Sequence, residues 1–222
     1  MKLLALDTST EACSVALALD GEIRERFEIE QRHGERVLAM VQELLEESGI
    51  ALTQLDAIAF GRGPGSFTSL RIGAGVVQGL AFGADLPVVP VSSLAVLAQG
   101  IDAPSIIAAF DARMRQIYTG AFRKESSLVV PAGPEVVVDP DALPVPDGVS
   151  WTGAGSGWDV YHESLQRRMG RSLERWILKA YPHARDAATL AEAEFMAGRA
   201  VKPEAAIPVY IRDDVAVKSS KL

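Results

Sequence analysis

The same β-meander pattern, in which the first strand ends at an acidic residue, occurs twice in this chain. Residues 2–7 and 13–18 have counterparts about 104 residues later at 106–111 and 117–122, at a nearly fixed offset. Such similarity indicates related structural units, and two copies are too few for a solenoid, whose repeats must stack to share a core. We therefore expect a pair of similar lobes.

The chain is long enough for two such lobes, because 222 residues exceed the roughly 150 that one domain typically takes. We place the N-terminal lobe at residues 1–102 and the C-terminal lobe at 103–222, with the tail of the second packing back on the first. Apolar residues make up 48% and charged residues 23%, as in folded globular proteins. The net charge of −7 argues against binding nucleic acid through a basic face of this chain.

Targeting signals and disulfides are not expected. The single cysteine, Cys13, allows no internal disulfide and no cysteine-built metal site, which fits a reducing cytoplasm. Asp7 interrupts the N-terminal apolar residues before a signal peptide could form. The longest apolar stretch, residues 72–91, includes Asp85 and two prolines, so it is a poor membrane span. We expect a cytoplasmic protein.

Alternating and helical hydrophobic periods give the elements of the first lobe. The expected strands are residues 2–7, 13–19, 23–29, 56–60 and 86–91, and the expected helices are 35–48, 67–82 and 93–99, the last capped by Ser92. A meander followed by alternating helices and strands, present twice, predicts an α/β fold. It is the duplicated ribonuclease-H-like fold of the actin-like ATPases, with a mixed β-sheet and flanking helices in each lobe.

The second lobe repeats the meander at 106–111, 117–122 and 128–130. We expect loops over the proline-rich residues 131–146, a strand at 149–152, helices at 158–168 and 187–201, and a last strand at 207–211. Trp151 and Trp158 flank a glycine-rich turn and are expected in the core or in the wall of a cleft rather than as a stacking platform.

Acids at strand ends are the first candidate for chemistry. In two-lobed ATP-binding folds such acids face the cleft between the lobes, and nearby hydroxyls and glycine turns contact phosphate. The candidate nucleotide-binding residues are Asp7, Thr8, Ser9, Asp111, Gly153 and Gly155. The alternative is that Asp, Ser and Thr after a strand bond to their own backbone and only form turns.

Three glycines lie on one face of the predicted helix 67–82. Gly75, Gly79 and Gly83 are four residues apart, and each interior glycine costs a helix about 1 kcal/mol relative to alanine. Such a face indicates close approach of another backbone, either the sheet of the same lobe or the helix of a partner. The sequence leaves both possibilities open.

No catalytic or metal constellation is expected. His33 would need a second ligand one helical turn later to hold a metal ion, and that position is Val37. Cys13 lies in a predicted buried strand without a neighbouring base, so it is not expected to act as a nucleophile.

Several segments together resemble the TsaB family, also called YeaZ, along nearly the whole chain. They are Leu4-Ala5-Leu6-Asp7-Thr8-Ser9-Thr10, His33-Gly34-Glu35-Arg36, residues 63–73 (GPGSFTSLRIG), Asp111-Ala112-Arg113 and Pro208-Val209-Tyr210-Ile211-Arg212. The Gly-Pro-Gly-Ser-Phe-Thr segment is the most specific. Ser69 and Gly34 depart from the usual residues at their positions, Gly and Ser respectively, without changing the assignment.

The resemblance implies a role in making threonylcarbamoyladenosine in tRNA beside the anticodon. The family resembles its catalytic relative TsaD, whose His-x-x-x-His motif is incomplete here at Val37, so it implies a non-catalytic subunit. Expected partners are a TsaD-type catalytic subunit and a TsaE-type ATPase, with a homodimer when alone and tRNA contacted only through the complex. No cofactor is expected on this chain alone; ATP and a metal ion are expected in the partner complex.

The resemblance also places the dimer and partner surface on two helices of the first lobe. We expect this surface among Val37, Leu38, Val41, Leu45, Ile72, Gly75, Val76, Gly79, Leu80 and Gly83, some of which must instead face the core of the lobe.

Three alternatives stay open at this point. The chain could be an ATP-dependent phosphotransferase or ATPase of the actin-like class, with Asp7 and Asp111 holding magnesium. A metal-dependent peptidase is disfavoured by Val37. A purely structural dimer without a catalytic partner is the third.

Overall fold

The computed structural model describes residues 1–29, 33–147 and 150–212 of the chain. The first lobe contains a five-stranded sheet of order β3-β2-β1-β4-β5. Its strands are β1 (Lys2–Asp7), β2 (Ala12–Leu19), β3 (Glu22–Ile29), β4 (Ala57–Gly61) and β5 (Val88–Val91). The predicted antiparallel meander β1-β2-β3 is confirmed, and β5 is parallel to β4 as expected.

The second sheet repeats this topology. It has the order β11-β10-β6-β7-β8, with β9 paired to β7. Its strands are β6 (Ser105–Asp111), β7 (Ile117–Glu125), β8 (Leu128–Pro131), β9 (Val136–Val138), β10 (Trp151–Ala154) and β11 (Leu173–Ile177). Strand β10 runs parallel to β6 as β4 runs parallel to β1, so the expected duplication is confirmed.

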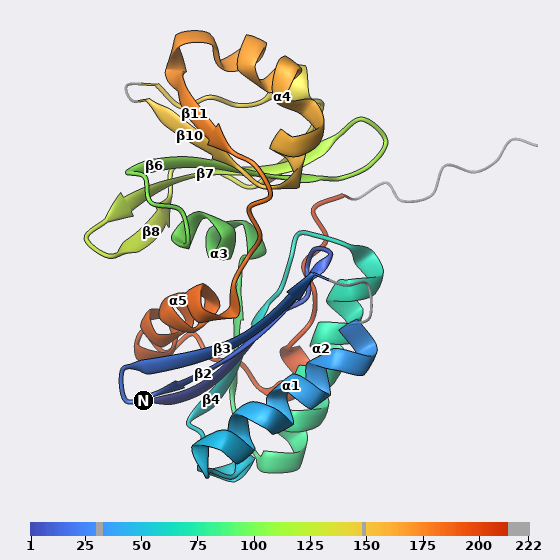
Figure 1. The fold of residues 1–222 in the computed structure, drawn as a ribbon, viewed down its shortest axis with the longest axis vertical. Helices are drawn as coiled ribbons and strands as arrows, with labels where there is room; N and C mark the ends of the chain where they lie inside the picture. The colour runs from blue at the N-terminus through green and yellow to red at the C-terminus, as the bar shows by residue number, and fades with distance from the viewer. Residues whose placement is uncertain (30–32, 148–149, 213–222) are drawn as a thin grey trace, which may run out of the picture.

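Helices alternate with the sheets in five layers (Figure 1). The helices are α1 (His33–Ser48), α2 (Phe67–Ala84), α3 (Ser93–Gln99), α4 (Ser156–Met169) and α5 (Ala184–Met196), and four 3₁₀ turns cover Leu52–Gln54, Pro140–Ala142, Gly170–Ser172 and Pro203–Ala205. Helices α1 and α2 cover the outer face of the first sheet, α3 and α5 lie between the sheets, and α4 covers the outer face of the second.

Three hydrophobic clusters join these layers. One packs the apolar side of α1, including Met40 and Leu44, and parts of α2 on the first sheet. A second contains the alanine-rich side of α5 and residues of both sheets, and a third surrounds Trp151 and Trp158 under α4. Both tryptophans are fully buried, so of the two expected places they take the core and not the wall of a cleft. Helix α5 therefore packs on the first sheet although it follows the second sheet in the sequence.

Several predicted boundaries in the second half are wrong. Residues 207–211 form no strand; Val209 donates one backbone hydrogen bond to Arg62, and Pro208 has no N–H to give a ladder. Helix α5 ends at Met196 rather than 201, because Gly198 adopts a left-handed conformation (φ 72°) that closes it. Strand β11 was not predicted at all, and β9 lies inside the region expected to be loop.

Within the described residues, every helix is too short or too polar to cross a membrane.

Candidate functional site

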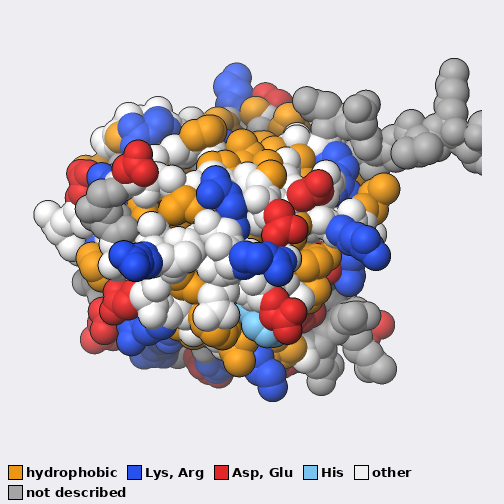
Figure 2. Space-filling model, turned by 90° about the horizontal axis from the view of Figure 1, so that it is seen from above, with side chains coloured by type: hydrophobic (Ala, Val, Ile, Leu, Met, Phe, Trp, Pro, Cys, Tyr) orange, Lys and Arg blue, Asp and Glu red, His pale blue; other side chains and the backbone are white. Residues whose placement is uncertain are grey.

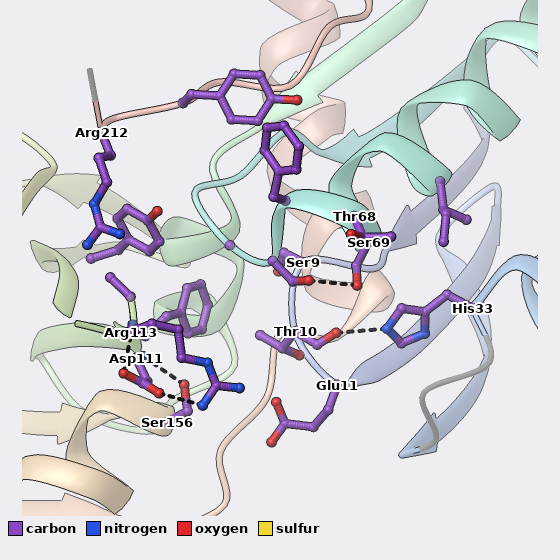
Figure 3. Close-up of a pocket in the computed structure, with 18 of the residues that line it drawn as sticks. Ser9, Thr10, Glu11, His33, Thr68, Ser69, Asp111, Arg113, Ser156 and Arg212 are labelled. Carbon is purple, nitrogen blue, oxygen red and sulfur yellow. Dashed lines mark hydrogen bonds and ion pairs between the residues drawn. The ribbon is translucent and has the colours of Figure 1, made fainter. Parts of the chain in front are cut away.

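A cleft of about 910 Å³ opens between the two lobes (Figure 3). Its first-lobe wall comes from the turn after β1, the start of α1 and the N-terminal end of α2, and its second-lobe wall from the end of β6, β7 and the start of α4. The lining residues are Ser9, Thr10, Glu11, His33, Gly34, Gly65, Ser66, Phe67, Thr68, Ser69, Ile72, Phe110, Asp111, Ala112, Arg113, Tyr118, Ser156, Val160, Tyr210 and Arg212. Hydroxyl groups, two arginines and aromatic rings thus face one space.

Asp7 does not line this cleft. Its carboxylate is buried, and Oδ1 accepts hydrogen bonds from the backbone N–H and the hydroxyl of Ser9 at 2.8 and 2.7 Å. Oδ2 accepts a bond from the Ser93 hydroxyl at 3.0 Å. Burial raises the pKa of Asp7 to about 6, although these hydrogen bonds oppose the shift. Asp7 therefore ties the β1 turn to the start of α3.

Asp111 stands at the equivalent strand end but faces the cleft. It accepts hydrogen bonds from the Tyr161 hydroxyl at 3.2 Å and from the backbone N–H of Arg113 at 2.9 Å, and its Oδ2 pairs with the Arg113 guanidinium at 3.1 Å. The two acids that the sequence places at equivalent positions thus differ in environment, and the structure does not bring them together in the cleft.

Of the other four candidate nucleotide-binding residues, one lines the cleft and three do not. Ser9 lines the cleft, whereas Thr8 is buried and donates its hydroxyl to the carbonyl of Ser69 at 2.8 Å. A Cβ at Gly153 would overlap the Trp158 ring, and one at Gly155 would overlap the Ala109 carbonyl. Packing inside the second lobe accounts for both glycines, and neither lines the cleft.

His33 is buried at the start of α1, and its Nε2 donates to the carbonyl oxygen of Thr10 at 2.8 Å. Val37, one turn later, is fully buried in the core. The part of the chain that the structure describes holds no group of three or more His, Cys, Asp or Glu side chains placed to bind a metal ion. Cys13 is buried as expected, and burial raises its thiol pKa to about 12.

The turn between β6 and β7 has an unusual backbone. Arg113, Met114 and Arg115 have φ values of 59°, 54° and 59°, so three consecutive non-glycine residues are left-handed. Each such residue costs roughly 1–2 kcal/mol relative to a right-handed conformation. The Asp111 bonds to Arg113 and a backbone hydrogen bond from Ala112 to Gln116 at 2.9 Å hold this turn in place. The sequence carries no signal for this backbone, because no glycine or asparagine marks these positions.

The glycine face of α2 is open. Gly75, Gly79 and Gly83 are exposed, and no described atom lies within 4 Å of the position that a Cβ would take at any of them. By contrast, a Cβ at Gly73 would overlap the Thr8 hydroxyl. The close approach inside the lobe is therefore made at Gly73, and the three spaced glycines leave a flat strip on the outside.

The structure divides the other interface candidates by burial. Val37 and Val41 are 0% and 3% exposed, so both belong to the core of the lobe. Leu38 is 50% exposed, and the remaining four are half-buried: Leu45, Ile72, Val76 and Leu80. A shallow groove between α1 and α2 is lined by Leu38, Val41, Gln42, Leu45, Glu46, Gly49, Ile50, Ala51 and Leu80. Phe82, beside Gly83, is 61% exposed and adds an apolar side chain that the predicted surface did not include.

Comparisons with known proteins give consistent results. A family model described as TsaD, tRNA N6-adenosine threonylcarbamoyltransferase, matches residues 28–219. The tRNA threonylcarbamoyladenosine biosynthesis protein TsaB of Escherichia coli is 41% identical over 98% of this chain and 97% of its own length.

Solved structures agree with this. The structure of YeaZ from Pseudomonas aeruginosa has a TM-score of 0.88 and 46% identity, and the match covers 94% of this chain and 99% of that one. Component A of (R)-2-hydroxyglutaryl-CoA dehydratase from Acidaminococcus fermentans has a TM-score of 0.50 at 11% identity, over 87% of this chain and 98% of that one, so it shares the fold alone.

Proposed function

The chain belongs to the TsaB family of tRNA threonylcarbamoyladenosine biosynthesis proteins, and from that premise we propose that it is a non-catalytic scaffold subunit. In this proposal it acts in the cytoplasm, forms a heterodimer with a TsaD-type catalytic subunit and recruits a TsaE-type ATPase to that pair. Alone it forms a homodimer. The transfer of the threonylcarbamoyl group takes place on the partner.

The open face of α2 carries this proposal. Gly75, Gly79 and Gly83, four residues apart on one exposed face, lower the stability of the helix and make no close contact inside the lobe. A second backbone packed against this face explains why glycine stands at these positions. Leu38 and the half-buried Leu80 line the neighbouring groove between α1 and α2, and the exposed Phe82 is next to Gly83 in α2. A flat apolar strip on two adjacent helices is suited to a helix of a partner, because small residues let the two backbones approach closely.

A non-catalytic role is supported by the cleft. Asp7 is buried and fully engaged by Ser9 and Ser93, so it is poorly placed to hold a metal-bound phosphate. Val37 occupies the place of a second metal ligand after His33. We therefore propose that this chain alone binds no cofactor, and that ATP and a metal ion act in the partner complex.

The charge distribution supports contact with tRNA through the partner. The chain carries a net charge of −7. Seen from the second-lobe end, Lys and Arg side chains alternate with Asp and Glu on the part of the surface that the structure describes (Figure 2). This face therefore lacks the clustered positive charge by which proteins hold nucleic-acid phosphates.

The decisive experiment is to reconstitute the modification of tRNA. The TsaD-type subunit, the TsaE-type ATPase and the enzyme that makes threonylcarbamoyl adenylate are combined with and without this chain. We expect modification only when this chain is present. Equal modification without it would refute the scaffold role.

The binding surface is tested by Gly79→Leu. Leucine favours a helix by about 1 kcal/mol relative to glycine, so the variant should remain folded while its side chain blocks the strip. We expect loss of binding to the TsaD-type subunit and a monomeric mass in light scattering. Gly133→Leu, at an exposed glycine of the second lobe with equally open space, is the matched control. Undiminished partner binding by folded Gly79→Leu would contradict the proposed surface.

A second candidate, an ATP-dependent phosphotransferase, is favoured only by Ser9 and Asp111, which do line the cleft. Calorimetric titration of the isolated chain with magnesium and ATP separates the two: micromolar binding would support the phosphotransferase.

A further inference from the structure

The C-terminal residues 201–212, called the strap below, are fastened to the first lobe along their length. Val201 and Val88 exchange backbone hydrogen bonds of 2.7 and 2.9 Å at the edge of the first sheet. Gln78 of α2 donates to the carbonyl of Ala206 at 3.2 Å, and the N–H of Val209 donates to the Arg62 carbonyl at 2.8 Å. The strap therefore moves with the first lobe.

Near its end, the strap is held by the N-terminal end of α2. The Tyr210 ring lies beside the Phe67 ring, with 5.3 Å between centroids. The Arg71 guanidinium lies 3.6 Å from the centre of the Phe67 ring, and its Nε donates to the Tyr210 hydroxyl at 3.2 Å. All three side chains are exposed, so this contact is made at the surface of the helix that carries the glycine strip.

Two residues later, Arg212 reaches the other lobe. Its Nη2 donates to Gln116 Oε1 at 2.6 Å, its Nη1 lies 3.7 Å from the Met114 sulfur, and the guanidinium is 5.9 Å from the centre of the Tyr118 ring. Figure 3 shows Arg212 extending from the strap along the second-lobe side of the cleft. Met114 belongs to the left-handed turn that Asp111 holds in place, Gln116 follows this turn, and Tyr118 lies in β7.

We propose that Arg212 is a latch that sets the separation of the two lobes, and that docking of a partner on α2 is coupled to this latch through Tyr210. The coupling rests on the proposed function, whereas the latch itself is a property of the isolated chain. One short chain of contacts joins the two sites: the glycine strip and Phe67 lie on one helix, Phe67 and Arg71 hold Tyr210, and Arg212 follows on the same strap.

The chemistry of the contact suits a releasable latch. Gln116 is a neutral acceptor, and hydrogen bonds to neutral acceptors are weaker than those between arginine and a carboxylate. Arg212 joins the strap, which is fastened to the first lobe, to Gln116 of the second lobe, so moving the two lobes apart stretches this contact. A partner that shifts the first turn of α2 changes the position of Tyr210 and hence of Arg212. By thermodynamic linkage, the factor by which partner binding changes the equilibrium of the latch equals the factor by which the latch changes the affinity for that partner.

The latch is tested on the isolated chain with one spin label in each lobe, at the exposed positions Glu22 and Arg168. Cys13 is buried and its thiol pKa is raised to about 12, so it does not compete for the label. Labelled protein is diluted with unlabelled protein so that distances within one chain dominate. We expect Arg212→Ala and Gln116→Ala each to shift or broaden the inter-lobe distance distribution, and Gln116→Glu to narrow it.

The matched control is Arg199→Ala, an arginine just before the strap whose ion pair with Glu194 stays within the first-lobe side. It should leave the distance distribution unchanged. Distributions for Arg212→Ala and Gln116→Ala that coincide with that of the unaltered chain would overturn the latch. Equal broadening by Arg199→Ala would also overturn it, since the effect would then not be specific to Gln116.

The coupling is tested by titrating the TsaD-type subunit. We expect Arg212→Ala to change the dissociation constant by about fivefold or more, the lower end of typical coupling between sites, although Arg212 is not on the glycine strip. A change of less than twofold would overturn the coupling while leaving the latch to stand on the distance measurements. Absence of binding by the unaltered chain would refute the proposed function and the coupling together, and the spin-label result would still decide the latch.

Discussion

The buried carboxyl of Asp7 makes a quantitative prediction about stability and pH. Burial raises its pKa from 3.8 to about 6, a shift of about 2 pKa units, and one unit corresponds to about 1.4 kcal/mol. The folded state therefore holds this proton up to about pH 6, whereas the unfolded chain releases it near pH 4. The folded state binds more protons in this window, so the free energy of unfolding must fall as the pH rises through it.

The magnitude follows from the shift. Between pH 4 and pH 7 the Asp7 contribution to the free energy of unfolding should decrease by about 2 kcal/mol, less than the full shift corresponds to, because the unfolded carboxyl is already more than half ionised at pH 4. Asp7→Asn removes the titration and keeps most contacts, because an amide oxygen can accept both Ser9 bonds and the amide nitrogen can donate to Ser93. The variant should therefore gain up to about 2 kcal/mol relative to the unaltered chain as the pH rises from 4 to 7.

The assay is urea unfolding followed by tryptophan fluorescence at pH 4, 5, 6 and 7, because Trp151 and Trp158 are fully buried in the folded state. The quantity of interest is the difference between variant and unaltered chain at each pH, which cancels other titrating groups such as Asp186, whose pKa burial also raises to about 6. Asp102→Asn, at an exposed position, is the control and should give a flat difference. A flat difference for Asp7→Asn as well would refute the reasoning.

Two further predictions concern backbone and packing. Arg115→Gly should raise the free energy of unfolding by roughly 0.5–1 kcal/mol, because relief of the left-handed strain exceeds the extra entropy of glycine in the unfolded chain. The control Arg168→Gly, in the helix α4, should lower the free energy of unfolding by about 1 kcal/mol. If both variants are less stable than the unaltered chain, the left-handed turn is unstrained. Gly153→Ala should lower the melting temperature clearly because its Cβ overlaps the Trp158 ring, whereas Gly133→Ala, with open space, should not; equal melting temperatures would contradict the close packing.

The sequence predicted local structure well wherever one period dominated. Both meanders, the parallel strands of the first lobe and the Ser92 cap, whose hydroxyl accepts from the Ala95 N–H at 3.2 Å, are confirmed. Residues 207–211 show that a local hydrophobic period does not always predict the structure. Their alternation resembles a strand, but Val201 already pairs with Val88 at the edge of β5. Which of two distant segments pairs with a sheet edge cannot be predicted from the local pattern of either segment.

The candidate site depended on contacts that no local pattern reveals. Asp7 and Asp111 occupy equivalent strand ends, yet only Asp7 is enclosed, because Ser93 reaches it from the start of α3. The glycines of α2 posed the same difficulty. Gly73 is only two residues from Gly75, but about 200° of helical rotation separates them, so one faces Thr8 and the other faces outward. Helical spacing predicts a shared face and cannot say which side of the lobe that face is on.

The position of α5 between the sheets has a consequence for synthesis. The inner face of the first sheet is covered by a helix that begins at residue 184, so residues 1–102 leave the ribosome with that face uncovered. At 5–20 residues per second, roughly 5–20 s pass before α5 has been made. During that time Leu3, Val89 and Val91 lack their final packing partners. The nascent chain therefore presents an apolar sheet face suited to a chaperone, and the first lobe can complete its fold only after nearly the whole chain has been translated.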